Sequence, residues 1–375
     1  MTSLPDLRRQ ASGSRRAYID WARGIAVIVM MEAHTLDAWT RAASRHTRLF
    51  ADAQILGGFA APLFLWLAGV GVVLSAARTT ERRGSRTAAV DALCRRGLEI
   101  FLLAFLFRLQ SFVLSPGTPP ALIFRVDILN VMGPAIVGAA LIWGVVSGAR
   151  STPRLVAAYA AVAAAIALAT PIVRGAAFVD ALPIWCQWYV RPAGDYTVFT
   201  LFPWAGFVFA GAACGALLVA APGRSRERRL HAWLGCAGLV LVAIGFYTAT
   251  QPSLYSHSSF WTTSPTYFAI RVGAMMAGLS ATYAIAALLA RAGIAVPALE
   301  RMGRSSLFVY WIHVELVYGY ASWLWHSRLP LWGTSIAFAI FSLLMYQTIV
   351  LRDGIVNAWR RRTRPITPEP QAVTA

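Results

Sequence analysis

Apolar segments long enough to cross a bilayer recur along nearly the whole chain, and no other feature constrains its fold as strongly. Hydrophobic residues make up 58% of the 375 positions, more than a soluble domain of this size needs. A segment in lipid must satisfy its own backbone hydrogen bonds, and these runs are too long for barrel strands, so each is expected to be a helix. The sequence therefore predicts an all-α, polytopic integral membrane helical bundle with about ten transmembrane helices, near residues 17–38, 53–77, 92–113, 124–146, 154–173, 198–220, 231–250, 265–290, 305–326 and 332–351.

The distribution of arginine predicts the orientation of these helices. If the N-terminus is taken as inside, the arginines gather in the inner segments and only six fall in the outer ones. This asymmetry satisfies the positive-inside rule with both termini cytoplasmic, and it favours a multi-pass protein of a bacterial-type inner (plasma) membrane. We attribute the net charge of +18 to this topology and to contact with anionic membrane lipids, with no nucleic acid as a partner.

The remaining composition indicates a single membrane domain with polar ends. We expect a disordered basic N-terminus at 1–15, a transmembrane domain at 16–352 and a basic, proline-rich cytoplasmic tail at 353–375.

The chain has no lysine, which excludes a catalytic Schiff base. The sequence is compatible with a homodimer. No metal is expected, because metal-ligand spacing is absent from the four cysteines, Cys94, Cys186, Cys214 and Cys236.

The first apolar segment carries ionisable residues, which are costly in lipid and usually functional. Arg23 and His34 are eleven positions apart, so they share one helix face and are separated by about 16 Å along the axis. Asp20 lies one turn before Arg23 and is expected to pair with it. Asp37, one turn beyond His34, either orients the imidazole or belongs to a solvated helix end.

Later segments bring polar residues to the expected depth of His34. The fourth places Arg125, Asp127 and Asn130 near that level, and the eighth places Arg271 a little deeper. We expect these groups to converge with His34 on one outer cavity, where the Asp127 carboxylate fixes the tautomer of the imidazole. The alternative for any one of them is an ordinary interhelical hydrogen bond.

Six stretches of the chain form a pattern in order and spacing: YIDWARGIAVIVMMEAHTLDAW, APLFLWLAGVGVVLS, CRRGLEIFLLAFLF, VDILNVMGPAIV, FPWAGFVFAG and GRSSLFVYWIH. They are similar to the heparan-alpha-glucosaminide N-acetyltransferase catalytic-domain family, a branch of the transmembrane acyltransferases related to acyltransferase-3 proteins, over most of residues 16–320. This resemblance implies transfer of an acetyl group from cytosolic acetyl-CoA to a sugar amine or hydroxyl on the outer side. It also implies a histidine as base or acyl carrier.

Two histidines compete for that role. The lysosomal members have an asparagine where this chain has His34, and their active histidine lies in the following outer segment, where this chain has His46. The acyltransferase-3 branch instead places its histidine at the spacing of His34. We favour His34, because it lies on a rigid helix, whereas His46 is flanked by arginines in a loop.

The residue types suit such a transfer. A thioester is already activated, so the protein has to deprotonate the acceptor, stabilise the oxyanion and hold both substrates in line. A neutral His34 suits the first task. We expect the acceptor to contact Asp37, Arg125, Asn130 and Arg271.

The donor is expected at the cytoplasmic mouth, where cations would bind the CoA phosphates. Its candidate binding residues are Asp20, Arg23, Arg304 and His313, with the last two placed near the cytoplasm on the ninth segment.

A different class of function is a proton-coupled transporter or exporter that uses the same intramembrane groups. The absence of an evident inverted repeat counts against a transporter.

Overall fold

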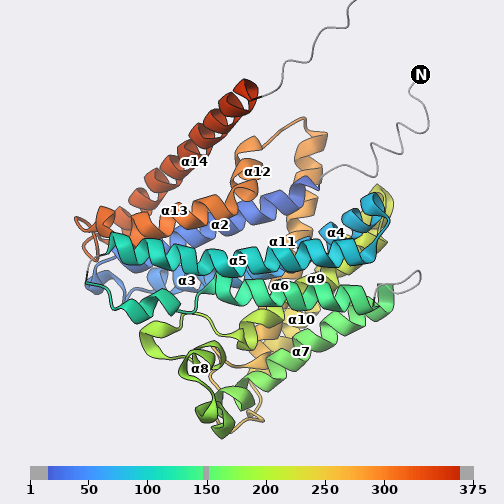
Figure 1. Cartoon of the computed structure of the whole chain (residues 1–375), viewed down its shortest axis with the longest axis horizontal. Helices are drawn as coiled ribbons and strands as arrows, with labels where there is room; N and C mark the ends of the chain where they lie inside the picture. Colours follow the sequence, from blue (N-terminus) through green and yellow to red (C-terminus); the bar gives the residue numbers. More distant parts are fainter. Residues whose placement is uncertain (1–15, 116, 147–151, 364–375) are drawn as a thin grey trace, which may run out of the picture.

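The computed structural model describes residues 16–115, 117–146 and 152–363. Within these ranges the chain is helical and has no strand, apart from two isolated β-bridges, which confirms the predicted all-α class. Figure 1 shows the long helices side by side in one bundle, with α2 beside α13 and α14 at the edge. The α-helices are α2 (Ala17–Trp39), α3 (Arg48–Gly57), α4 (Ala60–Arg83), α5 (Arg86–Leu114), α6 (Ile128–Val146), α7 (Thr152–Gly175), α8 (Ile184–Val190), α9 (Leu201–Ala220), α10 (Arg224–Ala249), α11 (Pro265–Arg291), α12 (Pro297–Arg304), α13 (Ser306–Tyr318) and α14 (Leu331–Arg362).

Eight helical segments among the described residues are long and apolar enough to cross a membrane. They correspond to α3 with α4, and to α5, α6, α7, α9, α10, α11 and α14. Two of the ten predicted spans, those at 17–38 and 305–326, are not among these eight. The first, α2, has 23 residues but is interrupted by ionisable side chains. The other, predicted at 305–326, is a helix of 13 residues that ends at Tyr318.

At the C-terminal end of the bundle, α14 continues as a helix through Arg362, beyond residue 352 where we expect the membrane domain to end. The domain bounds stay a prediction. Arg8, Arg9 and Arg15 of the predicted N-terminal tail and Arg364 of the C-terminal tail lie outside the described residues, whereas Arg360, Arg361 and Arg362 belong to α14. The cytoplasmic location of both termini therefore stays a prediction.

The close packing of α4 against α9 depends on glycine. A Cβ atom on Gly69 would lie 1.9 Å from the Val208 carbonyl oxygen, and one on Gly211 would lie 1.8 Å from that of Trp66. Such close approaches of two backbones are typical of helices that associate in lipid. The hydrophobic effect does not drive their association there, so it depends on van der Waals packing, and small residues let the backbones come close. The fully buried Trp66 and Phe207 belong to the same core cluster.

We expect Gly211→Ala to destabilise the bundle by about 3 kcal/mol, because the added methyl group meets a backbone oxygen that no side-chain rotation can move. Thermal unfolding of the purified protein in detergent measures the effect. Gly278→Ala is the matched control, since a Cβ on that helical glycine meets nothing within 4 Å. Equal midpoints for the two variants would contradict the role assigned to Gly211.

The packing of α12 and α13 against α2 brings two histidines together. A Cβ on Gly303 of α12 would lie 1.9 Å from the Asp20 carbonyl oxygen, and one on Gly24 of α2 would lie 2.4 Å from that of Leu299. These contacts fix α12 across the first turns of α2. The chain then continues into α13, which contacts α2 and places His313 beside His34.

Candidate active site

A cavity of about 910 Å³ runs between the helices and is lined from both ends of α2. Its arginine end is lined by Arg23, Ser75 and Arg96, and its histidine end contains His34 and Asp127. Arg23 and His34 thus open onto one continuous space, which is the arrangement that their spacing on the helix predicts. Further lining residues at the histidine end are Asp37, Arg108, Arg125, Arg271, Tyr310, Glu315 and Tyr318.

His34 is hydrogen-bonded to a second histidine. Its Nδ1 lies 2.8 Å from Nε2 of His313 on α13. The two rings are parallel within 4° and their centroids are 5.0 Å apart, as expected for imidazoles that meet edge to edge in one plane. In-plane contact directs the N–H of one ring at the lone pair of the other, which is the favourable geometry for this bond.

The partners of His313 determine the tautomer of both rings. Nδ1 of His313 lies 2.8 Å from the Val309 carbonyl oxygen, so it must be the protonated nitrogen that donates to it. In the neutral ring, Nε2 of His313 then accepts the N–H of His34 Nδ1. Nε2 of His34 is left with a lone pair, and no hydrogen bond to it is found within the described residues. A neutral imidazole held in this tautomer can accept a proton from a molecule in the cavity.

This arrangement corrects two of our predictions. We expected Asp127 to orient His34, but the hydrogen-bonding partner of His34 is His313. We also expected His313 nearer the cytoplasm, whereas it lies at the level of His34 because α13 begins only at Ser306 after the α12 turn.

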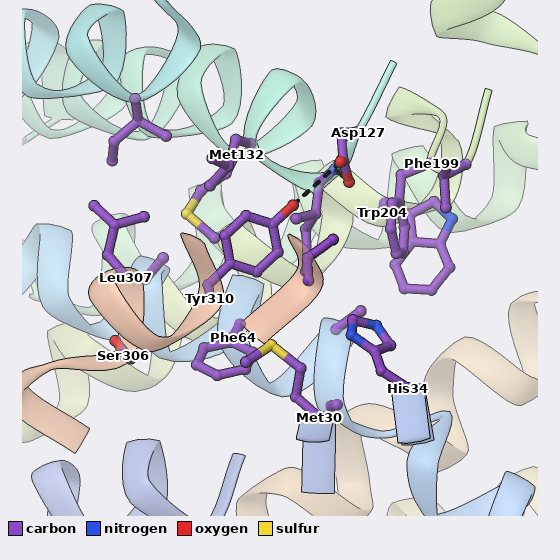
Figure 2. A pocket seen from close by; sticks show the side chains of 18 of the residues that line it. Met30, His34, Phe64, Asp127, Met132, Phe199, Trp204, Ser306, Leu307 and Tyr310 are labelled. Atoms are coloured by element: carbon purple, nitrogen blue, oxygen red, sulfur yellow. Dashed lines mark hydrogen bonds between the residues drawn. The ribbon is translucent and has the colours of Figure 1, made fainter. Parts of the chain in front are cut away.

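Asp127 has other partners across the same cavity. Its carboxylate forms an ion pair with Arg108 of α5 and accepts a hydrogen bond of 3.1 Å from the Tyr310 hydroxyl of α13. Figure 2 shows Asp127 and His34 on opposite sides of the space, with Tyr310 turned toward the carboxylate. Asp127 Oδ1 also accepts the backbone N–H of Ile128, so the residue caps the first turn of α6.

Of the four predicted acceptor-binding residues, Asn130 lies outside the cavity, whereas Arg125 and Arg271 line it. Asn130 is fully buried, and its Oδ1 accepts the backbone N–H of Asp127 as part of the same helix cap. The Arg271 guanidinium lies 4.1 Å from the centroid of the Tyr267 ring, and its Nε has no hydrogen-bond partner within the described residues.

Burial, reinforced by the neighbouring Arg108, lowers the pKa of the Arg125 guanidinium. Neither Arg125 nor Arg271 forms an ion pair within the described residues. The histidine end therefore presents two cations whose charge an incoming oxyanion would help to balance.

At the arginine end, Asp20 and Arg23 form the predicted pair, with 3.6 Å between Asp20 Oδ1 and Arg23 Nη1. A Cβ on Gly71 of α4 would lie 3.0 Å from Arg23 Nη2, so the glycine leaves room for this guanidinium in the cavity. The predicted donor residue Arg304 points elsewhere. It pairs with Glu300 at 3.1 Å and lines no part of the cavity.

The sequence left alternative roles for His46 and Asp37, and the structure shows where both residues lie. His46 is exposed in the turn after the 3-10 helix Ala42–Ser44 and does not line the cavity. Asp37 accepts a hydrogen bond of 2.9 Å from the Tyr318 hydroxyl, and the Tyr318 ring lies edge-on to His34 with centroids 5.5 Å apart. Asp37 therefore contacts the imidazole through Tyr318 rather than directly.

Sequence reasoning assigned His313 of α13 to the donor and missed the contributions of Tyr310 and Tyr318 to the histidine end. Tyr310 and Tyr318 line the cavity there, whereas His313 lies behind it and bonds to His34. His313 and Val317 recur at a helical spacing on one buried face. Two residues of the same face, His313 and Val309, make the hydrogen bond that fixes the tautomer. Within the described ranges, no group of three or more His, Cys, Asp or Glu side chains could hold a metal ion.

The fold and the cavity define a polytopic membrane protein with a polar cavity between its helices, which His34 and Asp127 line. Residues 15–252 match the family model described as "Heparan-alpha-glucosaminide N-acetyltransferase, catalytic". Since this match covers well over half of the chain, the chain belongs to that family and is a membrane acetyltransferase. The match includes His34 and Asp127 but ends before α11, so Arg271 and His313 lie beyond it. No curated protein matches the chain.

Proposed function

We propose that this acetyltransferase takes an acetyl group from acetyl-CoA at the arginine end of the cavity and transfers it to a sugar amine or hydroxyl at the histidine end. The observation that supports this proposal is the single continuous cavity that both Arg23 and His34 line. With the predicted orientation, the donor enters from the cytoplasm and the acceptor from the other side of the membrane.

The donor would be held by guanidinium groups. Arg23 and Arg96 line the arginine end, and forked guanidinium groups suit phosphate oxygens well. From Arg23 to His34 the cavity follows about 16 Å of helix axis, a length that an extended pantetheine arm of CoA can span. The thioester would then reach the imidazole while the nucleotide stays at the membrane surface.

The transfer itself needs one base. Nε2 of His34 accepts the proton of the acceptor N–H or O–H while the nitrogen or oxygen attacks the thioester carbonyl carbon. The resulting oxyanion lies in reach of the cations at this end, Arg125 and Arg271. Collapse of the tetrahedral intermediate breaks the C–S bond, and the imidazolium returns its proton to the departing thiolate. CoA thiol and the acetylated sugar are the products.

Sealed inside-out vesicles containing the protein test this proposal. Acetyl-labelled acetyl-CoA is added outside, where the cytoplasmic face is exposed, and glucosamine or an amino-sugar polymer is enclosed inside. We expect labelled, acetylated sugar inside the vesicles and free CoA outside. Movement of the unmodified sugar or of intact acetyl-CoA across the membrane, with no acetylation, would instead identify a transporter.

A further inference from the structure

A second hollow of the molecule adjoins the mouth of the cavity at its histidine end. This groove has a volume of about 620 Å³ and lies between the loop after α5 and the segment that joins α13 to α14. Ser115, Tyr318 and Gly319 line both the groove and the cavity. Because the Tyr318 ring also touches His34, the groove begins one side chain away from the imidazole.

The walls of the groove combine aromatic rings with polar groups. Tyr320 and Trp323 are 62% and 63% exposed, so their ring faces are open to a ligand. Neither the Tyr320 hydroxyl nor the His326 imidazole forms a hydrogen bond within the described residues. Thr118 and Arg328 complete a wall that contains no carboxylate.

We propose that this groove binds the sugar units that follow the reacting unit in an oligosaccharide acceptor. Sugar rings present apolar C–H faces that pack on aromatic rings, and hydroxyl groups that exchange hydrogen bonds with tyrosine and histidine. A lipid chain would leave those polar groups unsatisfied. The inference rests on the proposed function, since it places the reacting sugar at His34 and extends the acceptor outward along the groove.

Binding and turnover of glucosamine oligomers separate this inference from the proposed function. Equilibrium dialysis of the full-length protein in detergent, without acetyl-CoA, measures the Kd of labelled glucosamine and of its linear tetramer. We expect the tetramer to bind more tightly than the monomer. Trp323→Ala should raise the Kd of the tetramer by about tenfold and leave that of the monomer unchanged.

Trp332→Ala is the matched control, because Trp332 is also an exposed tryptophan, lies on the first turn of α14 and does not line the groove. It should change neither Kd. Equal affinities for monomer and tetramer, or a tetramer Kd unaffected by Trp323→Ala, would overturn the inference and assign Trp323 to the membrane interface. Tetramer binding that depends on Trp323 without any acetyl transfer would support the groove and refute the proposed function.

Discussion

Replacing His34 with alanine is expected to lower kcat for acetyl transfer by about 10²- to 10⁴-fold, because the acceptor loses the base that removes its proton. The KM for acetyl-CoA should change little, since the phosphates are proposed to bind at the other end of the cavity, near Arg23. Steady-state kinetics with labelled acetyl-CoA and glucosamine measure both constants. Thermal unfolding in detergent checks that the variant is folded.

His46→Ala is the informative comparison, because sequence reasoning left the two histidines in competition. His46 is exposed and lies outside the cavity, so its removal should leave kcat within about twofold of the unsubstituted protein. If His46→Ala were inactive while His34→Ala kept full activity, the base would be His46. The loop that carries it would then have to close over the cavity during turnover.

Replacing His313 with leucine is expected to lower kcat by about 10²-fold while leaving both KM values nearly unchanged. Leucine cannot accept the N–H of His34 Nδ1, so the imidazole is free to carry its proton on Nε2, where it cannot act as a base. His313 is fully buried and does not line the cavity, so we assign it a positioning role rather than contact with substrate. Steady-state kinetics with both substrates varied separates kcat from KM.

His313→Gln distinguishes this role from simple packing. The glutamine amide oxygen can accept a hydrogen bond from His34, so this variant should recover a large part of the activity that leucine loses. Equal activity of the two variants would contradict the assignment, as would an increase in the KM for acetyl-CoA. Comparison of their unfolding midpoints removes any contribution from lost stability.

Residue spacing along the chain predicted some contacts of the polar residues in the site and missed others. The pairing of Asp20 with Arg23 follows from their i, i+3 spacing, and the structure contains it at 3.6 Å. Arg304 was assigned to the donor from its depth alone, but its neighbour Glu300 one turn earlier holds it away from the cavity. Spacing within one helix can be read from the sequence, whereas the direction of a side chain, and the depth of a helix such as α13, depend on what lies around it.

The membrane class, most of the spans and the common face of Arg23 and His34 could all be predicted from the sequence. These properties depend on hydropathy and helical period, which are local. The hydrogen bond of His313 to His34 and the contacts of Arg108 and Tyr310 with Asp127 became known only from the packing of the helices. The pairs of His34 with His313 and of Asp127 with Tyr310 join segments far apart in the chain, whereas Arg108 reaches Asp127 from the preceding helix. Their formation depends on which helices pack together and at what height, through close contacts such as Gly303 against Asp20, and no local pattern encodes that choice.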